Sequence, residues 1–315
     1  MMIHKIISPV PFPEGTVNSF IIKDDALSIV DVGTKTPEAL EAIKEGVKNA
    51  GYQMEDIEQV ILTHHHPDHV GWIDAFPNAD VLGHVYVDAW LRRDPLFIGS
   101  HYQFYIDRMK EEGVPEKYFT WAKKMTRSVE MLGERTLTGI IHDGDEIPGH
   151  KGLVAVETLG HAQSHLAFWH EEKKVMIGGD LLLANISSNP LIEPPLNPKA
   201  KRAKSILQYN ASLKKLLTMP IEKLYSGHGD EITNVNELVH ARLEKQNLRA
   251  MNVLQLLNER PKTIFEINME IFPAVYERQL GLTLSQTIGQ MDYLMDVDLV
   301  TEEQDENGVF WYAKK

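Results

Sequence analysis

The 315-residue sequence contains no cysteine. Disulfide bonds, a cysteine nucleophile and a structural zinc site bound by thiolates are therefore excluded. No stretch approaches the roughly 18 apolar residues of a membrane span. The start, "MMIHKIISPVPFPEG", has neither the apolar run nor the small-residue cleavage pattern of a signal peptide. We therefore expect a cytoplasmic protein that does not enter the membrane.

Positive charge is also scarce. The sequence has 32 Lys and Arg residues against 45 Asp and Glu residues, which gives a formal net charge of −13. This balance argues against broad electrostatic binding to nucleic acid or to anionic lipid. Hydrophobic residues make up 43% of the chain, as in an ordinary globular protein, and its length is enough for one large core and a smaller module.

Strand-like and helix-like segments alternate through most of the sequence, which predicts an α/β fold. A helix is expected from Pro37 to about Ala50, with Thr36 as its N-cap and Gly51 just past its end. Residues 86–135 interrupt this rhythm with aromatic side chains and alternating charges, and we interpret them as a helical insertion. Strands are expected at 19–22, 27–30, 58–62, 79–83, 152–158, 165–169, 174–177 and 223–225.

The segment 63–69, "THHHPDH", places four histidines and an aspartate directly after the apolar run 60–62. Pro67 keeps a helix from running through it, so we expect the imidazoles on a turn at the end of a buried strand. Glycines, which let the backbone approach a site closely, flank three more ligand-type residues at the ends of later apolar runs. These are His161 in "TLGHAQSH", Asp180 in "VMIGGDLL" and His228 in "LYSGHGD".

Over about residues 1–235 this pattern resembles that of the metallo-β-lactamase fold hydrolases. An Asp-x-Gly element of that family falls on Asp31 and Gly33, a structural position and not a ligand. The resemblance implies a four-layer αββα sandwich with a centre of two divalent metal ions. The family's H-x-H-x-D-H motif falls on His64, His66, Asp68 and His69, and its later single ligands fall on His161, Asp180 and His228.

The resemblance also implies how these residues divide between the two metals. One ion takes His64, His66 and His161, the second takes Asp68, His69 and His228, and Asp180 bridges them. Such imidazole and carboxylate ligands suit Zn²⁺, with Fe or Mn as alternatives.

Two ions about 3.5 to 4 Å apart lower the pKa of a bridging water to about 7, so the expected nucleophile is a metal-bound hydroxide. Asp68 is expected to orient it and then to pass its proton to the leaving group. The sequence offers no G-x-S-x-G elbow as an alternative nucleophile.

The choice of substrate depends on weaker features. True β-lactamases of this fold commonly use a cysteine ligand or lack the bridging aspartate, so the chain is more similar to the branch with glyoxalase II, lactonases, phosphodiesterases, ribonucleases and β-lactamase-like protein 2. The aromatic, nearly neutral insertion favours an ester, thioester or lactone of a small molecule. A phosphodiesterase or ribonuclease is the alternative, and a non-catalytic metal-binding regulator or a di-iron redox protein are further ones. The phosphodiesterase alternative depends on a basic cluster in "NPKAKRAK", namely Lys199, Lys201, Arg202 and Lys204, which is otherwise a solvated helix start.

Several further residues have expected roles outside the ligand set. We expect His65 to be a polar surface spacer, and His165 to be structural or to support a ligating imidazole. Tyr102 and Tyr105 could donate to developing charge, but aromatic residues in such a segment more often pack. The insertion, with its aromatic residues Tyr102, Phe104, Tyr105, Tyr118, Phe119 and Trp121, and the loop around 187–199 are expected to wall the substrate pocket.

From about residue 236 a separate unit is expected, so the domains are 1–235 and 236–315. A helix at 236–258, a second from Thr263, a third apolar pattern and two strands around "NG" at 307–308 suggest a winged-helix-like domain, similar to that of some family members. Residues 241–315 carry 8 Lys or Arg and 12 Asp or Glu, the wrong balance for DNA. We expect this unit to serve in packing, as a lid or in a homodimer.

Overall fold

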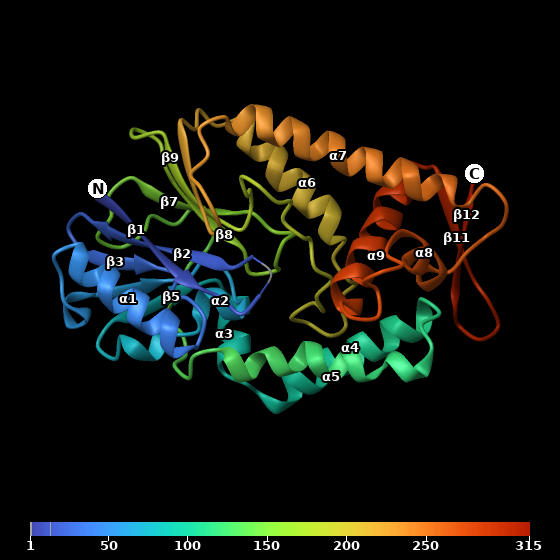
Figure 1. The fold of residues 1–315 in the computed structure, drawn as a ribbon, viewed down its shortest axis with the longest axis horizontal. Helices are drawn as coiled ribbons and strands as arrows, with labels where there is room; N and C mark the ends of the chain where they lie inside the picture. Colours follow the sequence, from blue (N-terminus) through green and yellow to red (C-terminus); the bar gives the residue numbers. More distant parts are fainter. Residues whose placement is uncertain (1, 13) are drawn as a thin grey trace.

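The computed structural model describes residues 2–12 and 14–315. Its first part is built on two β-sheets and its second part on three helices and a hairpin, and the two parts lie side by side along the long axis of the molecule (Figure 1). None of the helices in the described part of the chain combines the length and the apolar character that a membrane crossing needs.

The first sheet has six strands in the order β1-β2-β3-β4-β5-β6, and the second has four in the order β10-β9-β8-β7. Every predicted strand is present, while β1, at the edge of its sheet, and the two-residue β6 were not predicted. The strands of the first sheet are β1 (Met2–Pro9), β2 (Thr16–Lys23), β3 (Leu27–Val30), β4 (Gln59–Ile61), β5 (Asp80–Gly83) and β6 (Gly139–Ile140). Those of the second are β7 (Leu153–Glu157), β8 (Leu166–His170), β9 (Val175–Gly179) and β10 (Lys223–Ser226).

Three apolar cores stack through the first part and confirm the αββα sandwich. The first lies between the outer face of the six-stranded sheet and helices α1 (Pro37–Asn49) and α3 (Val85–Leu91). The second fills the space between the two sheets, with Phe20 and Phe168 among its largest fully buried side chains. The third joins the four-stranded sheet to α6 (Ser205–Leu216) and to the start of α7 (Val235–Gln255).

The strand directions explain why the predicted ligands can meet. Strands β3, β4, β5 and β6 run parallel, as do β9 and β10. Carboxyl ends of parallel strands lie at one edge of a sheet. Asp31, the "THHHPDH" segment, Asp180 and His228 follow β3, β4, β9 and β10, and they therefore gather at one edge of the sandwich.

The expectation that all imidazoles of the motif sit on a turn is partly wrong. Pro67 is the first residue of a short helix, α2 (Pro67–Val70), so Asp68 and His69 are helical, and only the three preceding histidines lie in the turn. Proline lacks a backbone N–H and its φ suits the first helical position, so it starts a helix here instead of only preventing one.

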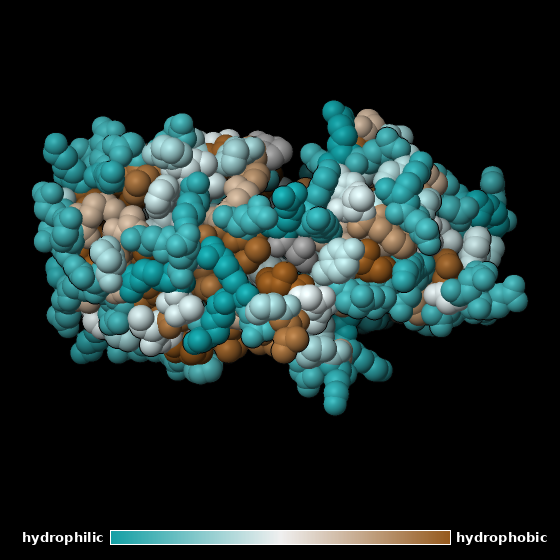
Figure 2. Space-filling view, turned by 90° about the horizontal axis from the view of Figure 1, so that it is seen from below, coloured by the Kyte–Doolittle hydropathy of each residue, from teal (hydrophilic) through white to brown (hydrophobic). Residues whose placement is uncertain are grey.

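The insertion is helical, as predicted, and consists mainly of α3, α4 (Pro95–Glu111) and α5 (Thr120–Arg127). It extends from the sandwich to the second part of the molecule, opposite α7 (Figure 1). In the space-filling view from that side, hydrophilic side chains cover most of the visible surface and hydrophobic ones gather near its middle (Figure 2). Leu96, at the start of α4, is 85% exposed.

Most of the aromatic side chains of the insertion cover a core. Phe104, Tyr118, Phe119 and Trp121 pack against the apolar cluster of the C-terminal helices. Tyr105 is buried and its hydroxyl donates to the carbonyl of Ile192. These five side chains therefore serve in packing, and the insertion as a wall of the substrate pocket stays a prediction. A C-terminal unit of this size buries little apolar surface by itself, so the insertion completes its core.

The C-terminal elements match their prediction: the end of α7, then α8 (Ile264–Ile271), α9 (Leu280–Asp296), β11 (Val300–Gln304) and β12 (Phe310–Lys314). Thr263 caps α8 and forms a capping box with Glu266. The start of α7 packs in the core of the sandwich, and its end packs in the core of the C-terminal helices, so this helix joins the two units. The domain boundary, the winged-helix assignment and a homodimer stay predictions.

A buried carboxylic acid ties the insertion to the C-terminal unit and gives a pH prediction. Burial raises the pKa of Glu112 to about 7, from its ordinary value of 4.5. Its carboxyl group accepts from Arg108 and from the Tyr312 hydroxyl, and Arg202 and Asp292 also act on it. Below about pH 4.5 the acid is protonated in both the folded and the unfolded state, and above about pH 7 it is ionised in both. Between these values only the unfolded state loses its proton, so stability falls as pH rises.

We therefore expect Glu112→Gln to gain stability relative to wild type as pH rises from 4.5 to 8, by up to about 3 kcal/mol. Urea unfolding of both proteins at pH 4.5, 6 and 8 measures this difference. Equal pH dependence of the two unfolding free energies would contradict it. Asp107→Asn, an exposed carboxylate on the same helix, is the matched control.

Candidate metal centre

The seven predicted ligands lie together at the edge of the sandwich. Within each group named below, one ligand atom per residue lies within 4.8 Å of the others. All seven are buried except His66, which is partly buried. The groups are His64, His66 and His161; His64, His69 and Asp180; and Asp68, His69 and His228.

In the first group, Nδ1 of His66 lies 3.1 Å from Nε2 of His64 and 3.0 Å from Nε2 of His161. In the third, Nε2 of His228 lies 3.3 Å from Oδ2 of Asp68, and Nε2 of His69 lies 3.8 Å from the same oxygen. These nitrogen and oxygen atoms thus form two adjoining sets of three, the first set and the second set.

Asp180 lies between the two sets. Its carboxylate oxygens lie 3.6 Å from Nε2 of His161 in the first set, and 3.5 Å and 3.3 Å from Nε2 of His69 and His228 in the second. The carboxylate can therefore contact an ion in either set, as a bridging ligand must.

Hydrogen bonds on the outer nitrogens fix the tautomers of the imidazoles. Nδ1 of His228 donates to the Thr16 carbonyl at 2.6 Å, and Nδ1 of His161 lies 3.0 Å from the Asn189 carbonyl and 2.8 Å from the Ser188 hydroxyl. Because a carbonyl only accepts, the proton is on Nδ1, and each Nε2 presents a lone pair to the centre.

Asp31 orients the remaining part of the motif. Its carboxylate accepts from the backbone N–H and the hydroxyl of Thr63, at 2.9 and 2.7 Å, and lies 2.7 Å from Nδ1 of His69. The Thr63 hydroxyl proton is thus used, so its oxygen accepts from Nδ1 of His64, 2.9 Å away. Both histidines then direct an Nε2 lone pair inward, and Asp31 has the structural position that the resemblance implied.

The donor set fits metal ions. In the described residues, Nε2 of His69 and Oδ1 of Asp180 are buried without a hydrogen-bond partner. Lone pairs and carboxylates that face one another repel unless a cation lies between them. Two ligand atoms each about 2.1 Å from a tetrahedral ion are about 3.4 Å apart, close to the separations found here. A backbone hydrogen bond from Gly227 to Gly179 holds the loops that carry Asp180 and His228 together.

The pKa values reflect this arrangement. Burial lowers the pKa of His66 and of His161 to about 3, so both imidazoles are neutral, as ligands must be. Burial opposes charge on His228 too, but the carboxylates of Asp180 and Asp68 raise its pKa to about 10. The negative charge of the second set therefore stabilises a neighbouring positive charge, and a bound metal ion would supply that charge in place of a proton on His228.

His165 supports the site from behind, as predicted. Its Nε2 accepts from the backbone N–H of Asp180 at 3.0 Å, and its Nδ1 lies 2.8 Å from the Thr158 hydroxyl. Gly179 precedes Asp180 with φ at +48°, and a Cβ on it would meet His165 and Thr63. Glycine is needed at this position for both conformation and space.

His65 is not a surface spacer, and that prediction is wrong. The side chain is buried, its Nδ1 lies 2.8 Å from the Ser164 hydroxyl and its Nε2 lies 2.9 Å from a Glu193 oxygen. The ring stacks on Trp90 of the insertion at an interplanar angle of 4°. Glu193, Ser164 and Ser188 were missed, because single polar residues in loops carry no periodicity or spacing that would mark them.

The remaining candidates lie away from the centre. Arg202 of the basic cluster forms a bidentate ion pair with the buried Asp292 of α9, at 2.6 and 2.9 Å, so it is not free to hold a phosphate. The Tyr105 hydroxyl bonds to Ile192, so packing is its role, and Tyr102 is 41% exposed.

Comparisons with known proteins agree with the fold. A probable metallo-hydrolase of Bacillus subtilis, YqjP, is 38% identical over 309 residues, which cover 98% of this chain and 96% of that protein. A β-lactamase-like protein 2 homologue of Caenorhabditis elegans is 23% identical over 84% of this chain and 74% of that protein.

Among solved structures, a metallo-β-lactamase family protein from Thermus thermophilus superposes with a TM-score of 0.82 at 23% identity, covering 99% of this chain and 98% of that one. Because the shared fold spans nearly the whole chain, it includes the C-terminal helices. The model of the metallo-β-lactamase superfamily matches residues 12–228, from just before the second strand to the last predicted ligand. The chain therefore belongs to the metallo-β-lactamase superfamily, whose members carry divalent metal ions at such a His and Asp cluster.

Proposed function

We propose that this metallo-hydrolase binds two divalent ions and cleaves an ester, thioester or lactone bond of a small molecule. The observation that carries the proposal is the convergence of five imidazole nitrogens and two carboxylates in two adjoining sets. His64, His66 and His161 hold one ion, Asp68, His69 and His228 hold the other, and Asp180 bridges them. Zinc suits these ligands best, with iron or manganese as alternatives.

When bound, the two ions supply positive charge that polarises the substrate carbonyl and lowers the pKa of water towards 7. The chain orients both reactants. Asp31 and the Thr16 carbonyl hold His69 and His228 in place, which keeps Asp68 at the edge of the second set. The Asp68 carboxylate accepts the proton of the attacking water and passes it to the leaving group.

An acyl substrate fits better than a phosphodiester or RNA. The net charge of the chain is −13. In the predicted basic cluster, Arg202 pairs with Asp292 and is not free to bind a phosphate. Polyanion binding needs several cations along a surface. A phosphodiesterase and a non-catalytic regulator are the alternatives that the experiment below distinguishes. We expect the protein in the cytoplasm.

We expect close to two metal ions per chain after expression in medium that contains zinc, iron and manganese. Mass spectrometry of the purified protein measures the content, and hydrolysis is then assayed on a thioester, a lactone, a phosphodiester and RNA. Turnover of the first two that is lost on chelation and restored by metal supports the proposal. Only trace metal would overturn the centre, turnover of the phosphodiester or RNA alone would overturn the acyl substrate, and two metals without turnover would favour the regulator.

A further inference from the structure

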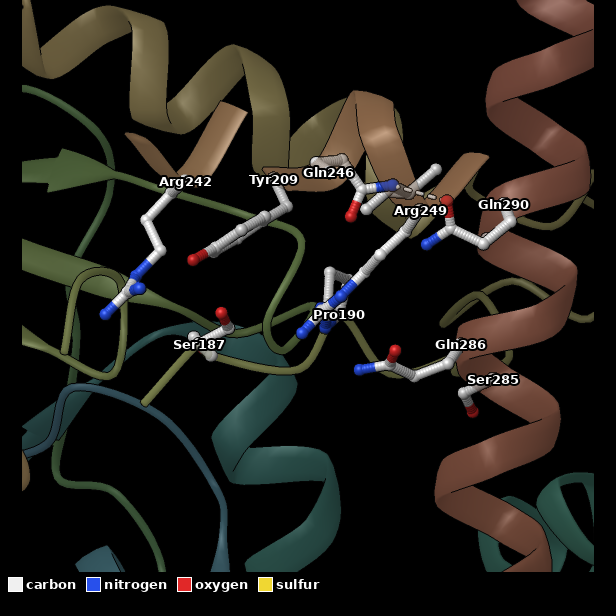
Figure 3. A pocket seen from close by; sticks show the side chains of 12 residues that line it. Ser187, Pro190, Tyr209, Arg242, Gln246, Arg249, Ser285, Gln286 and Gln290 are labelled. Atoms are coloured by element: carbon white, nitrogen blue, oxygen red, sulfur yellow. Dashed lines mark hydrogen bonds between the residues drawn. The ribbon is translucent and has the colours of Figure 1, made fainter. Parts of the chain in front are cut away.

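A narrow pocket lies between the sandwich and the C-terminal helices, beside the loop 187–190, whose Ser188 and Asn189 contact the His161 ring. Its walls come from α6, α7, α9 and residues 187–190. Figure 3 shows the Tyr209 side chain from α6, Arg242 and Arg249 from α7, and Gln286 from α9 directed towards the space beside this loop. Four segments that are distant in sequence thus contribute polar groups to one place.

The pocket has an excess of positive charge. Arg242 and Arg249 both line it, and none of the described residues that line it is acidic. Burial and the neighbouring Arg242 lower the pKa of Arg249, so the two cations repel. Two partly buried guanidinium groups without a carboxylate are costly in an otherwise acidic protein, unless an anion from outside pairs with them.

The donors in this pocket are not satisfied by the protein. In the described part of the chain, no hydrogen bond or ion pair reaches the Arg249 guanidinium. One amino group of Arg242 donates to the carbonyls of Leu183, Ala184 and Ile186, but its buried Nε has no partner among the described residues. These bonds hold Arg242 rigidly and leave its Nε donor for a ligand.

The Tyr209 hydroxyl is another such group. The side chain is only 6% exposed, and its hydroxyl, which interacts with that of Ser188, has no acceptor for its own proton at hydrogen-bond distance among the described residues. Rigid buried donors of this kind are typical of a binding site and rare in a solvated surface.

A wider groove of about 540 Å³ adjoins the pocket and shares Arg249, Gln286 and Gln290 with it. Apolar side chains form much of its lining: Val253, Ile271, Phe272, Val275 and Leu282. The cavity as a whole therefore has a cationic end and an apolar body. An organic anion with an aliphatic or aromatic body matches it, whereas a nucleic acid strand, with a charge on every residue, does not.

Two residues lie between the same cavity and the candidate metal centre. Ser188 lines the narrow pocket and Asn189 lines the wider groove. The Ser188 hydroxyl and the Asn189 carbonyl both contact Nδ1 of His161, and Gln286 donates to the Asn189 side chain at 2.9 Å. A ligand in the cavity thus lies against the loop that orients a predicted metal ligand.

We infer that this cavity binds the acidic end of an amphipathic substrate, with Arg249 as the principal cation and Arg242 and Tyr209 as fixed donors. The inference rests on the proposed function and narrows its substrate class to acyl compounds that carry a carboxylate or a phosphate on an apolar body. Arg249 is then a specificity-determining residue, remote from the bond that breaks.

The first test measures binding without hydrolysis. Octanoate and octyl phosphate should raise the Tm of the holoenzyme, and octanol, with the same chain and no charge, should not. Arg249→Gln should remove the effect of the two anions, while Lys245→Gln, which removes an exposed cation from the same helix, should keep it. No anion effect in wild type, or the same effect in Arg249→Gln, would overturn the site.

The second test measures hydrolysis of two p-nitrophenyl esters with equal chain length, one with a terminal carboxylate and one without. Arg249→Gln should raise KM for the acidic ester about tenfold or more, with kcat and the neutral ester unchanged. Binding of octanoate without this KM effect would overturn the substrate role. If no ester is cleaved, the proposed function fails, and the Tm test still decides whether the anion site exists.

Discussion

Replacing Asp68 with asparagine is expected to lower kcat by a factor of about 10² to 10⁴, the usual contribution of a positioned acid or base. The Asp68 side chain is buried, and its Oδ2 lies 3.3 Å from Nε2 of His228. Asparagine has nearly the same shape and keeps one ligating oxygen, but its amide neither accepts the proton of the attacking water nor delivers it to the leaving group. The fold is therefore expected to persist while turnover is lost.

Steady-state kinetics on whichever ester, thioester or lactone the wild type cleaves measure this effect, with metal content determined on the same samples. His64, His66 and His161 are untouched, so at least one ion should remain. Asp107→Asn, the same change at an exposed position of α4, serves as the control and should leave kcat unchanged. An Asp68→Asn enzyme that retains near wild-type turnover would remove Asp68 from the proton transfer.

The sequence predicted the convergence of the seven candidate ligands for a physical reason. Each ligand type followed an apolar run, and apolar runs of that length become buried strands. Parallel neighbours then carry the residues that follow them to a common edge, as Asp180 after β9 and His228 after β10 demonstrate. Glycines beside these residues marked places where backbones approach closely, and Gly179 shows such an approach to His165.

Features that depend on contacts between distant loops were not predictable in this way. The sequence does not reveal that His65 is buried, because its partners Ser164 and Glu193 lie about 100 and 130 residues away. Both partners stand in loops, where no regular spacing of residues marks them. The aromatic residues of the insertion were correctly identified as unusual, but composition does not reveal what they cover. Their partner is the C-terminal cluster, where Phe265 lies with its ring centroid 5.5 Å from that of Tyr118.

The same limit applies to the cationic cavity. Arg242 and Arg249 are seven residues apart on α7 and face the same side of the helix, yet a pair of arginines on a helix is ordinarily solvated. Only the packing of α7 against α6 and α9 encloses them with Tyr209 and leaves no acidic residue in the described lining. In the sequence, the cluster around Arg202 was the alternative for holding a phosphate, and packing pairs Arg202 with Asp292.

Gly227→Ala is expected to disrupt the candidate metal centre although Gly227 is not itself a ligand. A Cβ on Gly227 would collide with Oδ1 of Asp180 and would lie 3.1 Å from the Gly179 carbonyl group. The backbone cannot move away easily, because the Gly227 N–H donates to Gly179 and its carbonyl accepts from Asn18, each at 2.7 Å. The added methyl group therefore displaces the Asp180 carboxylate, which lies between the two sets of ligands.

The expected result is a fall from two metal ions per chain to one or fewer and a loss of about 10- to 100-fold in turnover, the usual effect of displacing groups that position ligands. The free energy of unfolding should fall by about 1–3 kcal/mol, as for other overpacked sites. Gly99→Ala is the matched control, because a Cβ there has no neighbour within 4 Å. If Gly227→Ala keeps both ions and wild-type turnover, then Asp180 does not bridge them, since the space that the methyl group takes is the space its carboxylate needs.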